Sequence, residues 1–191
     1  MCPRSVEILR HAERAVPEQA AAILAAGLVA HVGFVAEGQP QVIPMSYQYA
    51  QSEPNVLYLH GSPASRLVTT LLKGAPACVS VTLLDGVVFS KTAKYHSQNY
   101  RSVVCYGRAR LVGERARKAK IYEAMISRYT PGRIAGRDYV PATDSDLDAS
   151  AVLAFEIESW SAKARSGGPK GPHDADESSP GTCGVLLPSH P

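Results

Sequence analysis

Residues 58–66 read Tyr-Leu-His-Gly-Ser-Pro-Ala-Ser-Arg, and this stretch contains the residue types that could bind an anion. An apolar strand runs into a glycine, and a helix is expected to follow it. Ser62 is a favourable N-cap and Pro63 suits the first helical position. Free amides at a helix start, the hydroxyls of Ser62 and Ser65 and the guanidinium of Arg66 together describe a phosphate cradle.

Arg66 is the unusual residue of this junction, because a cation in the first turn of a helix opposes the helix dipole by roughly 0.3 to 1 kcal/mol. A bound phosphate would compensate for this. The alternative is an ordinary strand-to-helix turn with a solvated arginine. His60, beside Gly61 at the strand end, is either a hydrogen-bonded structural histidine or a group that faces the ligand, and spacing leaves both open.

A second candidate lies in the strand expected over residues 41–49, where Pro44 removes a backbone donor from the ladder. Either this is simply an edge strand, or a flat ligand lies against the strand and uses the freed backbone groups. The residues concerned are Ile43, Pro44, Met45 and Ser46.

Two further polar segments could hold an anion. Residues 94–102 are expected to form a donor-rich loop before a strand, although such a loop is often only solvated. Its candidate ligand-binding residues are Asn99, Tyr100, Arg101 and Ser102. Lys163 and Arg165 lie on the same side of an extended chain, where they could form a second contact with an anion. A charge pair of this kind can also be solvated.

Composition limits the classes of function. The chain has 191 residues, a hydrophobic content of 45% and a net charge of +3, which fit one globular protein with a slight preference for anionic small molecules. Basic residues are scattered and aromatic residues make up only 7%, so nucleic acid is not expected as a partner.

Neither the cysteines nor the histidines have metal-ligand spacing, so no metal site is expected. No segment approaches the ~18 apolar residues of a membrane helix, and no apolar signal core is visible, so we expect a cytoplasmic location without a membrane contact.

Hydrophobic periodicity predicts a mainly β protein with peripheral helices. Most strands follow one another through short turns, which favours a closed or nearly closed antiparallel barrel over a parallel sheet. The segment Leu84-Asp85-Gly86 is the strongest turn signal. Residues 1–165 are expected to form the barrel domain, and the Gly, Pro, Ser and acidic composition of residues 166–191 predicts a flexible tail. The expected strands are 29–36, 41–49, 56–60, 77–83, 87–91, 102–112 and 152–158, and the expected helices are 17–26, 62–73 and 114–129.

Six segments in order resemble the flavin-nucleotide-binding proteins related to pyridoxamine 5'-phosphate oxidase, and the nitroimidazole reductases look like the nearest branch. They are residues 38–45, 58–66, 78–86, 96–103, 131–133 and 161–169. The resemblance implies an antiparallel split β-barrel that binds FMN at the interface of a homodimer. One departure is that Thr182 stands where similar proteins usually carry a tryptophan, two residues before Gly184.

The resemblance also implies roles for the candidate residues. The strand of residues 44–47 would border the isoalloxazine, and Ser65 and Arg66 would hold the phosphate together with residues 99–102. Lys163 and Arg165 would be the matching contact from the partner subunit. In the nitroimidazole reductase branch, a histidine at the position resembling His60 lies near flavin and substrate.

These observations predict an FMN-dependent oxidoreductase that acts on a small aromatic or heteroaromatic compound, with NAD(P)H as the expected electron source. A flavin carries such chemistry itself, so no catalytic triad is required. The alternative is a split-barrel protein that binds or sequesters flavin or haem without turnover, and a deazaflavin in place of FMN also stays open.

Overall fold

The computed structural model describes residues 6–188, which form seven strands and several short helices. The strands are β1 (Val29–Ala36), β2 (Gln39–Tyr49), β3 (Val56–Gly61), β4 (Ala77–Phe89), β5 (Ser97–Leu111), β6 (Ala151–Arg165) and β7 (Gly184–Leu186). The α-helices are α1 (Ala20–Ala26), α2 (Arg66–Leu72), α3 (Arg115–Tyr129) and α4 (Asp144–Ala149). Three 3-10 turns complete the described elements, η1 (Ala12–Arg14), η2 (Pro17–Gln19) and η3 (Ala93–Tyr95).

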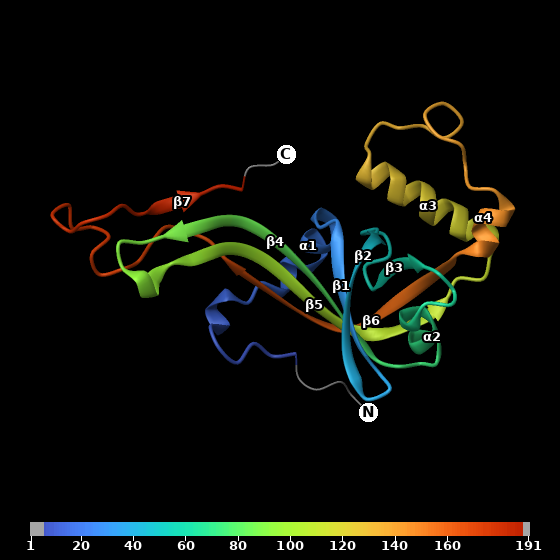
Figure 1. Ribbon diagram of the computed structural model, residues 1–191, viewed down its shortest axis with the longest axis horizontal. Helices are drawn as coiled ribbons and strands as arrows, with labels where there is room; N and C mark the ends of the chain where they lie inside the picture. Colours follow the sequence, from blue (N-terminus) through green and yellow to red (C-terminus); the bar gives the residue numbers. More distant parts are fainter. Residues whose placement is uncertain (1–5, 189–191) are drawn as a thin grey trace.

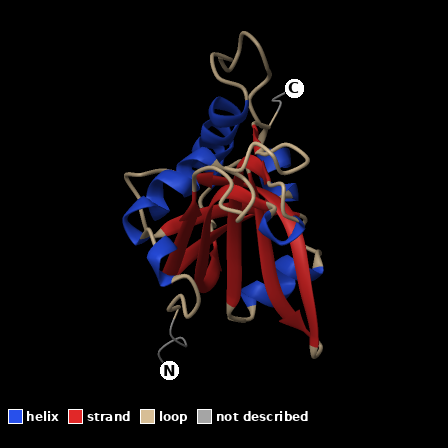
Figure 2. Ribbon diagram, turned by 90° about the vertical axis from the view of Figure 1, so that its left-hand side faces the viewer, coloured by secondary structure: helices blue, strands red, loops and turns tan. Residues whose placement is uncertain are grey.

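The strands close into a ring. They follow the order β1-β2-β3-β6-β5-β4, and β1 also pairs with β4 (Figures 1 and 2). Every strand pairing is antiparallel. Glu37 and Gly38 join β1 to β2 with φ of 51° and 77°, the left-handed geometry that a two-residue hairpin turn needs. The expected antiparallel barrel with helices on its outside is confirmed.

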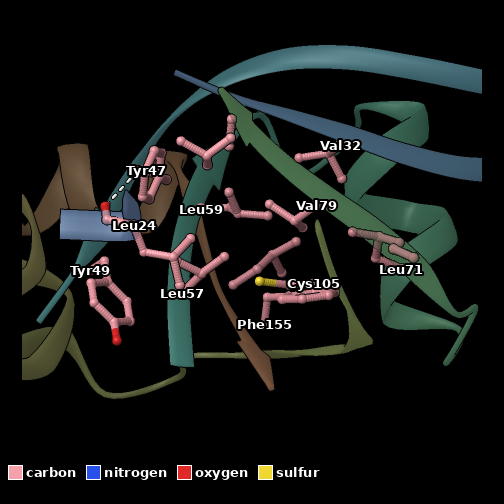
Figure 3. Packing of buried hydrophobic residues seen from close by; sticks show 14 of the residues in the cluster. Leu24, Val32, Tyr47, Tyr49, Leu57, Leu59, Leu71, Val79, Cys105 and Phe155 are labelled. Carbon is pink, nitrogen blue, oxygen red and sulfur yellow. Dashed lines mark hydrogen bonds between the residues drawn. The ribbon is translucent and has the colours of Figure 1, made fainter. Parts of the chain in front are cut away.

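The barrel interior is filled by alternate residues of the strands, as the sequence pattern predicts. Leu57 and Leu59 of β3 and Phe155 of β6 are fully buried there (Figure 3). Tyr47 of β2 is also fully buried, and its hydroxyl donates to the carbonyl oxygen of Leu24 at 2.6 Å. This hydrogen bond satisfies the phenol inside the apolar core and ties α1 to the barrel.

Helix α3 covers part of the outer face of the barrel. Ile121 of α3 packs against Tyr58 of β3 and against Val152 and Ala154 of β6. This second apolar layer explains why residues 151–155 of β6 are all buried rather than alternating, since they have the barrel core on one side and α3 on the other. α3 has 15 residues, and no helix among residues 6–188 is long and apolar enough to cross a membrane.

The turn expected at Leu84-Asp85-Gly86 is wrong. β4 continues through this segment, and the pairing with β5 shifts register between Leu84 and Gly86 as at a β-bulge. A Cβ at Gly86 would lie 2.9 Å from Val185 of β7, so a close strand contact requires glycine here. The carboxylate of Asp85 accepts two hydrogen bonds from the guanidinium of Arg101 on β5, at 2.9 and 2.7 Å. The residues that favour a turn therefore form a β-bulge, and the ion pair between Asp85 and Arg101 stabilises it.

The last barrel strand is longer than its apolar pattern indicates. β6 was expected to end at residue 158, but it continues to Arg165 alongside β5. Beyond it, β7 pairs with residues 87–89 of β4. Asp174 accepts hydrogen bonds from the Ser90 hydroxyl and the Lys91 amide, both at 2.8 Å. The sequence carried no signal for β7, and the flexibility of the segment after residue 165 stays a prediction.

Helix α4 was not expected, although its start carries a recognisable cap. The side chain of Thr143 accepts from the amide of Asp146, whose carboxylate accepts in turn from the amide of Thr143. Lys118 of α3 is buried, and its ammonium group donates to the carbonyl oxygens of Leu147 and Ser150 at 2.8 and 2.9 Å. These bonds hold the end of α4 against α3.

The C-terminal end of α3 is fixed to the barrel by Arg128. Its guanidinium donates to the carbonyl oxygen of Tyr47 at 3.0 Å and to that of Leu24 at 2.7 Å, and further bonds reach Ala25 and Gly27. It also lies over the Tyr47 ring, 4.3 Å from the centroid. A cation at the end of α1 satisfies carbonyl groups that the helix itself leaves unpaired.

We expect Arg128→Met to lower the free energy of unfolding by about 2 to 4 kcal/mol, because several half-buried carbonyl groups lose their donor. Urea denaturation measures this change. Ser127→Ala on the exposed side of the same helix is the control and should stay within about 0.5 kcal/mol of the parent. If the two variants were equally stable, the guanidinium contacts would contribute nothing to anchoring α3.

Candidate functional site

β2 has one edge that is only partly paired. Its residues 39–46 pair with β1, whereas only residues 47–49 pair with β3. The predicted residues Ile43, Pro44, Met45 and Ser46 therefore all lie where, among residues 6–188, β2 has a strand partner on one side only. β2 thus lies inside the sheet order yet has an open edge at Pro44, and a flat ligand against this edge stays a prediction.

The end of β3 lies beside this open edge. A Cβ at Gly61 would lie 3.7 Å from Cε of Met45, so the Met45 side chain covers the glycine. Ser62 follows in a turn in which its carbonyl oxygen accepts from the amide of Ser65 at 3.0 Å. The site residues predicted on β2 and on β3 are thus neighbours in space.

Helix α2 begins three residues later than expected. Ser65, not Ser62, is its N-cap, with an extended backbone and a hydroxyl that accepts from the Val68 amide at 3.2 Å. The turn from Ser62 to Ser65 occupies the residues that the sequence assigned to the first helical turn. As a result Arg66 is the first residue of the helix, and within residues 6–188 its guanidinium has no hydrogen bond or ion pair. An exposed, unpartnered guanidinium at this junction is available to an anion.

The other predicted anion-binding residues form a separate cluster on β5 and β6. Asn99, Tyr100, Arg101 and Ser102 lie within strand β5 and not in the loop that was expected. In β6, Arg165 is opposite Tyr100 and Lys163 is opposite Ser102.

Most polar groups of this second cluster already have partners. Arg165 donates to the side-chain oxygen of Asn99 at 2.5 Å, and the amide of Asn99 donates to the Gly167 carbonyl at 3.1 Å. Lys163 donates to the carbonyl oxygen of Arg10 at 3.0 Å, and Arg101 is held by Asp85.

Within one chain the two clusters do not meet. Arg108, near the other end of β5, donates to the carbonyl oxygen of Gly74 just after α2. Asn99 precedes Arg108 by nine residues of the same strand, which corresponds to about 30 Å of extended chain. Figure 1 shows α2 and the beginning of β5 on opposite sides of the molecule. A single copy of the chain therefore does not bring Arg66 and Asn99 to one phosphate.

A cavity of about 390 Å³ opens between α3, the loop that follows it and the ends of β2 and β3. Two predicted residues, Ser46 and His60, line it. The others come from α3 and its loop and were not predicted as site residues: Tyr122, Met125, Ile126, Tyr129, Thr130, Arg133 and Tyr139. The helical spacing of Tyr122, Ile126 and Tyr129 indicated a packed helix face, which is the pattern that a cavity wall also produces.

His60 is the titratable group of this cavity with a shifted pKa. Burial lowers its pKa from the ordinary value of 6.5, since desolvation penalises the charged ring. Its Nδ1 is buried without a hydrogen-bond partner in the described structure. The ring meets Tyr122 edge-on, with centroids 5.6 Å apart and planes at 71°. A neutral imidazole fixed against an aromatic ring is thus presented at the junction of β3 and the cavity.

Among residues 6–188 no group of three or more His, Cys, Asp or Glu side chains could hold a metal ion. The three cysteines in this range are free thiols, and burial raises the pKa of Cys105 to about 12, so that this thiol stays protonated. The chemistry of the site therefore rests on His60, on the cations and on the open β2 edge.

A closed antiparallel barrel whose β2 and β3 separate beside a helix start is the architecture of the split-barrel proteins. Residues 17–164 match the family model of pyridoxamine 5'-phosphate oxidase. The chain belongs to the pyridoxamine 5'-phosphate oxidase family.

Two solved structures are similar over most of their length. A flavocytochrome from Azotobacter vinelandii is 31% identical, with 97% of this chain and 87% of that chain covered and a TM-score of 0.79. An FAD and haem binding protein from Mycobacterium smegmatis is 30% identical, with 91% and 83% covered and a TM-score of 0.78.

A 5-nitroimidazole antibiotic resistance protein from Bacteroides thetaiotaomicron shares the fold at 19% identity and a TM-score of 0.64, with 78% of this chain and 85% of that chain covered. No curated protein matches the chain in sequence.

We expect the ring protons of His60 to titrate in NMR spectra with a midpoint below 6.5, because burial disfavours the imidazolium. Tyr122→Ala opens one side of the ring to water and should move the midpoint up toward the ordinary value. Ser127→Ala, at an exposed position of the same helix, is the control and should leave the His60 midpoint unchanged. A midpoint at or above 6.5 in the parent protein would contradict the lowering of the His60 pKa by burial.

Proposed function

We propose that this protein is an FMN-binding flavoprotein oxidoreductase that acts on a small aromatic or heteroaromatic compound, with NAD(P)H as electron donor. The observation that carries the proposal is the unpartnered guanidinium of Arg66 at the start of α2, next to the open edge of β2. The family match and the two relatives named as flavin or FAD proteins support a flavin in this position. A cytoplasmic location with its supply of reduced nicotinamide suits this activity.

The residues present fit an FMN at this junction. Arg66, with the hydroxyls of Ser62 and Ser65, would bind the phosphate, and the amides of the first helical turn point the same way. The backbone of residues 43–46 would orient the ring, since its outer groups have no strand partner in the described chain. When bound, the flavin supplies hydride or electron transfer. The apolar walls of the cavity exclude water next to that ring, and His60 offers a neutral imidazole to the substrate.

FMN is our choice of flavin because one guanidinium with two serine hydroxyls suits a single terminal phosphate. The FAD named for the Mycobacterium smegmatis relative is the other outcome of the binding test.

We propose further that the active form is a homodimer. The separation of about 30 Å along β5 between Asn99 and the end of α2 supports this proposal, because two clusters on opposite sides of one chain can meet across a two-fold axis. Lys163 and Arg165 of the partner subunit would then approach the phosphate held by Arg66. The substrate would enter the α3 cavity, which opens beside Ser46 and His60.

Purified protein should take up FMN, turn yellow and oxidise NAD(P)H with an aromatic acceptor. Arg66→Ala and Arg165→Ala should each weaken FMN binding by about 1 to 3 kcal/mol, through loss of a charge-assisted contact. Calorimetry with FMN, and in parallel with FAD, measures this loss. A mixture of the two variants, refolded together, should regain tight sites, because a mixed dimer contains one site with both arginines.

Lys73→Ala, at the opposite end of α2, is the control for charge alone and should leave the affinity unchanged. Colourless protein that binds neither flavin would remove the proposed function. Weakened FMN binding by each variant without recovery in the mixture would remove the shared site but leave the flavin.

A haem-binding role is the second candidate, and two observations favour it. Both relatives at 30–31% identity are named as haem or cytochrome proteins, and the imidazole of His60 lines an aromatic cavity. A neutral histidine nitrogen is a common axial ligand of haem iron.

Added haem should then produce a Soret band that His60→Ala removes, whereas His96→Ala, at an exposed histidine outside the cavity, should keep it. An unchanged spectrum in His60→Ala would exclude this histidine as the ligand. Absence of any Soret band in the parent protein would exclude the haem role.

A further inference from the structure

Two cavities lie side by side along α3 and share a wall. The second, of about 200 Å³, is lined on one side by α3 and on the other by residues 139–142 and Asp146. Tyr122, Ile126 and Tyr139 line both this cavity and the larger one at His60. These three side chains therefore separate the two spaces, and displacing one of them would join the cavities.

Tyr139 is the member of this wall that can move. Tyr122 and Ile126 stand on α3, which Arg128 and Lys118 fix at both ends. Tyr139 lies in the loop between α3 and α4, and its backbone is held by a bond from the Gly136 amide to its carbonyl oxygen at 2.9 Å.

The side chain of Tyr139, by contrast, is held by packing alone. Its hydroxyl makes no hydrogen bond to any residue of the described range, and the adjacent Val140 is 85% exposed. Rotation of the Tyr139 ring therefore breaks no hydrogen bond, whereas movement of Tyr122 or Ile126 would disturb the packed helix.

The lining of the larger cavity indicates the chemistry of its ligand. Its polar groups include His60 and Arg133, and no carboxylate lines it. Arg133 donates to the carbonyl oxygen of Asp138, which leaves most of its five N–H groups for another acceptor. The rest of the wall is mainly tyrosine, methionine and isoleucine. A flat aromatic ring with an acidic group matches this combination of apolar walls and a single guanidinium.

We propose that the α3 cavity binds an aromatic acid and that Tyr139 determines how many fused rings it accepts. One ring fits beside His60 with its carboxylate toward Arg133, and a second fused ring requires the space behind Tyr139. The inference rests on the proposed function only in treating the bound acid as the substrate of the flavin. Binding of the acid itself needs no turnover.

Binding of benzoate and 2-naphthoate to the parent protein, Tyr139→Ala and Tyr139→Phe tests this proposal by calorimetry. Tyr139→Ala should bind 2-naphthoate at least about tenfold more tightly, because the second ring becomes buried, and benzoate within about twofold of the parent. Tyr139→Phe keeps the ring and should match the parent for both acids. Val140→Ala is the matched loop control, and thermal melts establish that each variant is folded.

Arg133→Gln locates the binding, since it should weaken both acids and leave neutral benzamide unaffected. Equal changes for the two acids in Tyr139→Ala, no change in either, or no binding of benzoate to the parent would overturn the proposal. The titrations are run with and without FMN. Failure of the proposed function appears as absent flavin binding, whereas failure of this inference appears in the ratio of the two acid affinities.

Discussion

The separation of β2 from β3 is the constraint on which the candidate site depends. The two strands pair over residues 47–49 of β2 and then part, while β1 keeps pairing with β2 and the ring stays closed through β4. Residues 43–46 therefore have a strand partner on one side only, and they have it beside the end of β3 and the start of α2. Met45 packs over Gly61 at the end of β3, since a Cβ at this glycine would lie 3.7 Å from the Met45 Cε, an ordinary van der Waals distance.

Hydrogen bonds and one ion pair divide the cations of the two candidate clusters into two groups. Arg101, Arg165 and Lys163 are engaged by Asp85, Asn99 and the Arg10 carbonyl oxygen, and they stabilise the long β4–β5–β6 extension. Arg66 has no such partner in the described chain, although all of these residues look equivalent in the sequence. This difference in partners, rather than in residue type, is the reason that we propose Arg66 as the phosphate-binding residue of this cluster.

Helix α3 connects barrel stability to the shape of the cavity. Arg128 and Tyr129 bind backbone groups of α1 and β2, and Lys118 binds the end of α4, so the helix is held along its length. The cavity residues Tyr122, Met125 and Ile126 stand between these two anchors. A rigid helix opposite a loop that is fixed mainly through its backbone gives the cavity one firm wall and one adjustable wall.

The sequence by itself determined the fold class, the positions of most barrel strands and most helices, because hydrophobic period and turn residues are local properties of the chain. It also indicated His60 and Arg66 as candidate site residues, through their positions at a strand end and a helix start. Only the tertiary structure decided that Leu84-Asp85-Gly86 is a bulge, since β7 and Arg101 must be in place to stabilise it. The cavity on α3 likewise depended on long-range contacts, because an aromatic stripe that lines a space has the same spacing as one that fills a core. Distance between segments that lie far apart in the chain, such as Arg66 and Asn99, is set by how the strands are ordered around the barrel, and no local pattern encodes it.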